Sequence, residues 1–244
     1  NLSLIQSSYA VMFRKQKQKN EIANLSILAW LRKAELEGMT IEVEKFSRRK
    51  LKTFISTFRK LTLKAPPQFF PELQKLCAEC GVALVLVEDL PKTYICGATI
   101  WRNNKAILAL SVRGKRADIF WFTFFHELAH LIHHAKRQFH INYENNAEED
   151  EANKIARNYL IPDHLYQDFI NNYPYTDQKQ IVNYANKIEI APCILVGRLL
   201  HRSKQGDVLF VWLQLGGSPR IYLNIRLRSI SNSGRIPGLI RSLL

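Results

Sequence analysis

The residues with the clearest chemical potential form the motif His-Glu-Leu-Ala-His at positions 126–130. The motif lies within residues 121–134, a stretch predicted to be helical, so His126 and His130 project from one face of the helix, one turn apart. Two imidazoles placed in this way can bind one Zn²⁺. Glu127 points about 100° around the helix, where it can take a proton from a water molecule that the metal activates. A helix with a chance stripe of His and Glu is the alternative, but the apolar surroundings of the motif favour a metal site.

A catalytic zinc ion normally has three protein ligands and a water molecule, so a third ligand is expected. His140 lies in a predicted loop and is the weaker candidate. The acidic run at residues 148–151 opens the next predicted helix, although carboxylates there also complement the helix dipole. Within that run, Glu149 shares a helical face with Ala152 and Ala156, whose small side chains would allow a close approach to the metal-binding helix. We therefore expect Glu149 to be the third ligand.

The elements that must position these residues follow from the spacing of apolar side chains. Helices are expected over residues 21–37, 43–61 and from 66 to 81, and again over 117–134, 147–161, 162–171, 176–188 and 191–200. Short apolar runs at residues 82–87, 93–101 and 106–112 predict a small three-stranded antiparallel sheet, with a tight connection at residues 102–105. A β-hairpin over residues 208–228 is expected beyond the helices. This pattern predicts an α+β fold.

Cysteine content and apolar run lengths limit the class of protein. Four cysteines in 244 residues do not form a disulfide scaffold, and Cys77 and Cys80 at the end of a predicted helix are interpreted as buried apolar residues. Reduced thiols favour a cytoplasmic protein. The longest apolar runs are too short to cross a bilayer, and no secretory signal follows the first residue, so we expect no membrane partner.

Positive charge is concentrated at the two ends of the chain. The net charge is +14; residues 1–64 contain 14 basic and 5 acidic residues, and residues 202–244 contain 7 and 1. Such ends would attract a polyanion such as DNA, or they form solvated basic surfaces, and the sequence does not decide between these two. Residues 178–201 have the form of a helix-turn-helix unit with Arg198 and Arg202 as phosphate contacts, but the same helices more simply complete a core.

Two longer segments resemble the ImmA/IrrE family of zinc metallopeptidases: WFTFFHELAHLIHH and EEDEANKIARNYLIP. The resemblance implies a zincin-like helical body, with the zinc ligands falling on His126, His130 and Glu149 and the general base on Glu127. Ile155 stands where the family usually has Phe, and His134, not His133, matches its frequent trailing histidine. Four further segments resemble the subgroup in which an XRE-type helix-turn-helix domain precedes the peptidase: AWLRKAELEG, LCAECGVALVLVEDLP, CGATIW and IEIAPCILVGRLLH. They extend the resemblance to about residues 22–203.

The expected organisation has three parts. Residues 1–64 form a basic arm and helices that link to an upstream DNA-binding domain, residues 65–203 form the metallopeptidase domain, and residues 204–244 form a basic tail. The chain starts with Asn, so we expect the upstream domain to lie before residue 1. The sequence does not predict an oligomeric state.

The resemblance implies a cytoplasmic zinc endopeptidase whose protein substrate is a transcriptional repressor, cleaved under stress or during induction of a mobile element. The alternative is a DNA-binding regulator or antitoxin-like protein that uses the metallopeptidase fold as a sensor or scaffold. The presence of Glu127 counts against that alternative, because a fold kept only for binding has no need of a general base. Tyr143, Arg157 and Tyr159 are open candidates for stabilising an oxyanion beside the metal.

Overall fold

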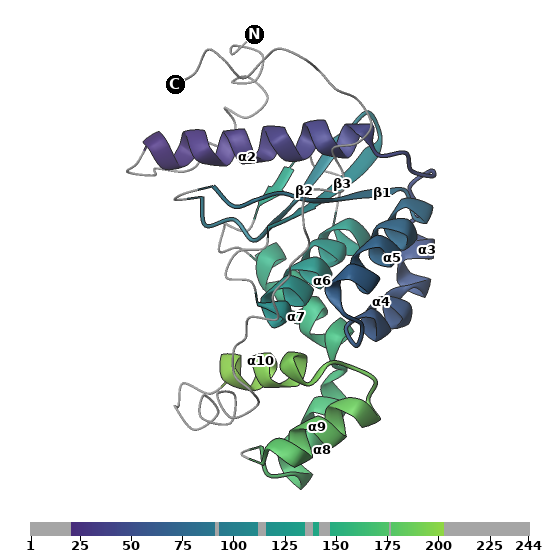
Figure 1. The fold of residues 1–244 in the computed structure, drawn as a ribbon, viewed down its shortest axis with the longest axis vertical. Coiled ribbons are helices and arrows are strands. Elements are labelled where there is room, and N and C mark those ends of the chain that lie inside the picture. Colours follow the sequence, from purple (N-terminus) through teal and green to yellow (C-terminus); the bar gives the residue numbers. More distant parts are fainter. Residues whose placement is uncertain are drawn as a thin grey trace.

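A computed structural model describes residues 21–90, 93–111, 116–134, 139–141, 147–175 and 177–202. A four-stranded sheet separates helix α2 (Glu21–Thr40) from the other helices of the described chain (Figure 1). The strands are β1 (Val82–Leu86), β2 (Gly97–Arg102), β3 (Lys105–Leu110) and β4 (Phe139–Ile141), in the order β1-β3-β2-β4. The architecture is α+β, as the sequence predicts.

The sheet differs from the predicted antiparallel three-stranded sheet in two respects. Strands β2 and β3 do form the expected hairpin, and Asn103 and Asn104 between them have φ values of 48° and 64°, as in a type I′ turn. Strand β1, however, is parallel to β3. The chain leaves β1 and enters β2 at the same end of the sheet, so β2 runs back and β3, which lies between them, runs in the direction of β1. A fourth strand, β4, pairs with β2; its three residues are too short to produce an alternating pattern, which is why the loop prediction for His140 was wrong.

Both faces of β1 are covered, since all five of its residues are buried. Helix α5 (Pro66–Glu79) lies next to this strand, and the side-chain amide of Gln74 donates a hydrogen bond to the backbone carbonyl of Leu84 (3.1 Å). On the other side of the sheet, α2 contributes Trp30 and Leu31, both fully buried, to a second apolar cluster with the sheet residues Ile107 and Ala109.

The predicted helix over residues 43–61 is two short helices, α3 (Arg48–Thr53) and α4 (Ile55–Leu61). The residues before Ser47 are not helical because the N–H groups of Glu44 and Ser47 donate to the carbonyls of Ala78 and Cys80 at the end of α5. Gly81 has a φ of 81°, and a Cβ there would lie 2.3 Å from the Cα of Phe46, so only glycine fits this close approach.

The remaining helices form the body of the molecule. They are α6 (Ala117–His133), α7 (Ala147–Leu160), α8 (Asp163–Asn172), α9 (Gln178–Lys187) and α10 (Pro192–Arg202), and the last three lie at the end of the molecule far from α2 (Figure 1). The possible helix-turn-helix unit completes the core, since residues from α9 and α10 are buried in it: Ile181, Tyr184, Ala185, Ile194, Leu195, Val196 and Leu199. The main core also contains Leu51, Phe58 and Leu61 from α3 and α4.

Cys77 and Cys80 are free and buried, which confirms their interpretation as apolar residues. Burial raises the pKa of the Cys77 thiol and raises that of Cys80 to about 11, so both stay protonated at neutral pH. Within the described residues, no helix has the length and apolar character needed to cross a bilayer. The expected hairpin at 208–228, the arm at 1–20 and the tail at 204–244 lie outside the described residues, and the proposed domain boundaries stay a prediction.

Candidate metal centre

The three predicted ligands lie together where α6 packs against α7. His126 and His130 occupy one face of α6, and Glu149 in the first turn of α7 faces them. Ala152 and Ala156 are fully buried between the two helices, so their small side chains do allow the close approach expected from the sequence. His126, His130 and Glu149 are almost completely buried, with exposed fractions of 1%, 2% and 9%.

The ligand atoms converge on a single point. The Nε2 atoms of His126 and His130 lie 3.0 Å apart, and they lie 3.1 Å and 3.2 Å from the two carboxylate oxygens of Glu149. Burial alone would raise the pKa of Glu149, but its hydrogen bonds with the two histidines lower it to about 2. Two imidazole nitrogens and one ionised carboxylate are a donor set that suits Zn²⁺ and leaves a coordination position open.

Glu127 is fully buried beside these predicted ligands, and its two carboxylate oxygens differ in their hydrogen bonding. Its Oε2 accepts a hydrogen bond from the Thr99 hydroxyl of β2 (2.8 Å), whereas Oε1 has no hydrogen-bond partner within the described part of the chain. Gly97 keeps this space clear, because a Cβ at that position would lie 3.0 Å from Oε1. Burial raises the pKa of Glu127 above its ordinary value, and the nearby His126 and His130 oppose the rise. A buried carboxylate with one unused oxygen is suited to exchange a proton with a water molecule.

A second layer of side chains fixes the orientation of both histidines. Nδ1–H of His126 donates to Oδ1 of Asn153 (3.0 Å), which directs Nε2 toward the centre. His130 Nδ1 lies 2.8 Å from Nδ1 of His134, whose Nε2 lies 3.4 Å from the carboxylate of Glu151. With His134 donating to Glu151, its Nδ1 accepts the Nδ1 proton of His130, which keeps the Nε2 of His130 directed at the candidate metal centre.

His133 and His134 therefore have different surroundings. His134 is buried against His130, and the Arg48 guanidinium donates to its backbone carbonyl (2.6 Å). His133 is exposed and lies 2.8 Å from the hydroxyl of Tyr159. The histidine that matches the family's trailing position is the one that contacts His130, a predicted ligand.

The other residues named from the sequence occupy various positions. The backbone of His140 lies in β4, opposite Thr99, and Arg157 lines a pocket beyond the centre. Tyr143 lies outside the described residues. Sequence reasoning missed the role of Thr99, because nothing in the sequence shows that β2 passes over Glu127. Asn153 lies next to Ala152 in EEDEANKIARNYLIP, one of the segments that carry the family resemblance.

Two histidines one turn apart on a buried helix, with a glutamate from the neighbouring helix beneath a small sheet, define a zincin-like metallopeptidase fold. Residues 79–195 match the IrrE N-terminal-like domain, a peptidase family, and this match confirms the resemblance to ImmA/IrrE proteins. Membership of a peptidase family implies a protein substrate. No significant match was found among curated proteins.

Proposed function

We propose that the protein is a zinc-dependent endopeptidase of the ImmA/IrrE type. His126, His130 and Glu149 would hold the zinc ion, which when bound would act as a Lewis acid toward a water molecule and the scissile carbonyl. The observation that carries this proposal is the convergence of three buried ligand atoms beside the open Oε1 of Glu127.

Glu127 acts as the base and then as the acid in this proposal. Its Oε1 takes a proton from the attacking water as the water oxygen forms a bond with the carbonyl carbon. The peptide C–N bond then breaks, and Glu127 delivers the proton to the departing amine nitrogen. Thr99 keeps the carboxylate aligned through Oε2, and the raised pKa of Glu127 brings it closer to the neutral range in which a base can both accept and return a proton.

The resemblance to ImmA/IrrE proteins further suggests a cytoplasmic enzyme whose substrate is a transcriptional repressor. A repressor of the XRE type is the candidate to test first. The second candidate function, a DNA-binding regulator that uses this fold as a scaffold, is favoured by the positive charge at both ends of the chain. It predicts salt-dependent DNA binding that survives the Glu127→Gln substitution.

Metal content and cleavage test the proposal together. Elemental analysis of the purified chain is expected to find one zinc ion per chain, lost or strongly reduced in His126→Ala and Glu149→Ala. Glu127→Gln is expected to keep the zinc ion and to abolish cleavage of a co-expressed repressor. Absence of metal from all of these proteins after reconstitution would overturn the metallopeptidase proposal and favour the DNA-binding regulator.

A further inference from the structure

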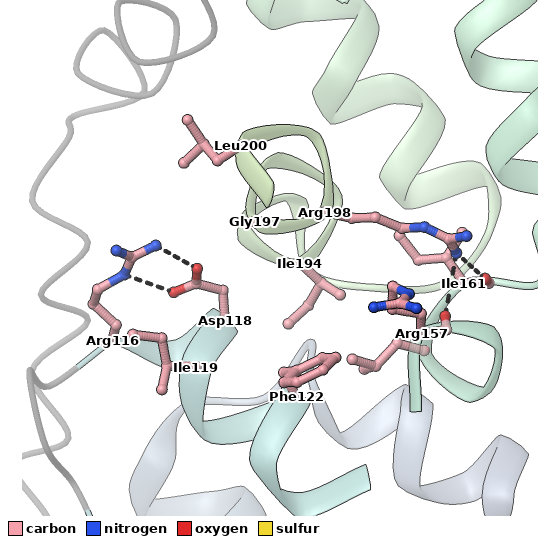
Figure 2. A pocket seen from close by; sticks show the side chains of 11 residues that line it. Arg116, Asp118, Ile119, Phe122, Arg157, Ile161, Ile194, Gly197, Arg198 and Leu200 are labelled. Atoms are coloured by element: carbon pink, nitrogen blue, oxygen red, sulfur yellow. Dashed lines mark hydrogen bonds and ion pairs between the residues drawn. The ribbon is translucent and has the colours of Figure 1, made fainter. Parts of the chain in front are cut away.

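A cavity of about 490 Å³ lies next to the candidate metal centre, between the start of α6, the end of α7 and α10 (Figure 2). Its size is within the range of sites that bind small ligands or substrate side chains. Phe122 faces Ile194 across this cavity, with Arg116 and Asp118 on one side and Arg157 and Arg198 on the other (Figure 2). Most of its wall is apolar, and the contributing side chains are Ile119, Phe122, Leu160, Ile161, Ile194 and Leu200.

Each of two walls of this cavity begins one helical turn from a residue of the candidate metal centre. On α6, Phe122 precedes His126 by one turn, and the two ring centroids are 6.2 Å apart. On α7, Arg157 follows Asn153 by one turn, and Asn153 is the residue that holds His126 Nδ1. One turn rises about 5.4 Å, and an extended peptide covers about 3.3–3.6 Å per residue. A peptide bound at the metal centre can therefore place a side chain in the cavity from one or two residues beyond the scissile bond.

The three arginines of the cavity differ in their partners. Arg116 forms a two-pronged ion pair with Asp118, at 3.1 Å and 2.6 Å. Arg198 donates to the carbonyls of Arg157 and Ile161, pairs with Asp163 and lies over the Tyr166 ring. The half-buried guanidinium of Arg157 makes no hydrogen bond or ion pair with any residue that the structure describes.

We infer that this cavity is the specificity subsite of the enzyme, and that it binds a large apolar substrate side chain next to an acidic residue. The apolar wall accepts the aliphatic or aromatic group, and Arg157 at the edge binds the neighbouring carboxylate. Arg157 is thereby a specificity-determining residue and not an oxyanion stabiliser. This inference rests on the proposed peptidase function, because it assigns the cavity to the same substrate.

Binding of three labelled peptides tests the inference without relying on cleavage. The peptides carry Glu-Leu-Glu, Lys-Leu-Lys or Glu-Ser-Glu in the same alanine background, and their affinity for the full-length Glu127→Gln protein with zinc is measured by fluorescence anisotropy. Glu-Leu-Glu is expected to bind about fivefold more tightly than Lys-Leu-Lys and about tenfold more tightly than Glu-Ser-Glu.

Two substitutions should each remove one of these preferences. Arg157→Glu is expected to remove or reverse the preference for Glu over Lys. Leu200→Trp fills the cavity and is expected to remove the preference for Leu over Ser. Lys154→Glu is the matched control, since it reverses an exposed charge on the same helix outside the cavity and should leave both preferences intact.

The outcomes separate this inference from the proposed function. Absence of peptide binding, or preferences that survive Arg157→Glu and Leu200→Trp, would overturn the assignment of the cavity. The preferences could depend on both residues while the protein with Glu127 intact cleaves none of the peptides. That result would support the subsite and count against the peptidase. Cleavage of all three peptides at equal rates would support the peptidase and overturn the subsite.

Discussion

Thr99 contacts Glu127 through a single hydrogen bond of 2.8 Å, so the proposed base depends on one hydroxyl group. The bond stabilises the ionised form of a carboxylate whose pKa is already raised by burial. Glu127 must be ionised to act as the proposed base, so the activity of the proposed peptidase is expected to rise with pH through the pKa of Glu127. Loss of the hydroxyl would raise that pKa further and move the acidic limb of the activity profile to higher pH.

Thr99→Val is therefore expected to shift the acidic limb of kcat/KM upward in pH and to reduce the free energy of unfolding by about 1–2 kcal/mol, because a buried oxygen loses its donor. Thr99→Ser keeps the hydroxyl and serves as the control. A pH profile of Thr99→Val that coincides with that of the unmodified protein would contradict the role assigned to Thr99.

His134 orients a proposed ligand, whereas its neighbour His133 does not contact one. His134→Ala removes the group that faces Nδ1 of His130, so the affinity for zinc is expected to fall about 10- to 100-fold. His133→Ala is expected to leave that affinity unchanged. Competition with a chromophoric chelator measures both values, and equal affinities in the two variants would exclude a positioning role for His134.

At the scale of elements, the site depends on how closely β2 passes over α6. A Cβ on Gly97 would lie 2.5 Å from Cγ2 of Thr123 and 3.0 Å from Oε1 of Glu127. Gly97→Ala is thus expected to push the strand away from the helix and to reduce the free energy of unfolding by about 1–3 kcal/mol. Thr123→Ser removes the closest atom, so the double variant should recover part of that loss in urea unfolding. A double variant no more stable than Gly97→Ala would show that the crowding lies elsewhere.

The sequence could predict the elements whose signal is local. Helix α6 is a continuous apolar run and α7 is an amphipathic pattern, so the positions of His126, His130 and Glu149 on their helical faces could be predicted from spacing. Residues 43–61 were wrongly predicted as one helix, because the backbone of residues 44–47 bonds to the end of α5, a contact between distant segments. The direction of β1 and the placement of Thr99 over Glu127 also depend on how the chain crosses the sheet, and no local pattern encodes this.

At the scale of the whole molecule, the fold extends beyond the matched family domain. The match starts at residue 79, but α2, which precedes it, covers the face of the sheet opposite the candidate metal centre (Figure 1). Trp30 and Leu31 are fully buried there, whereas Leu36 on the same helix is 54% exposed. A protein restricted to residues 79–195 would therefore expose an apolar sheet face to water.

Leu31→Ala is expected to reduce the free energy of unfolding by about 2–5 kcal/mol, because it leaves a void between α2 and the sheet. Leu36→Ala is expected to change the free energy of unfolding by no more than about 0.5 kcal/mol. Chemical denaturation followed by tryptophan fluorescence measures both. Similar small effects from the two substitutions would mean that α2 contributes little to the stability of the fold.

The hydrogen bond from Gln74 to the carbonyl of Leu84 has a consequence for the behaviour of the protein at high concentration. Strand β1 is at the end of the sheet, and the exposed backbone of such a strand commonly pairs with a strand from another molecule and starts aggregation. Here the side-chain amide of Gln74 donates to the carbonyl of Leu84, and α5 lies next to the strand. The protein is thereby protected against edge-to-edge association through β1, the longer of the two edge strands of this sheet.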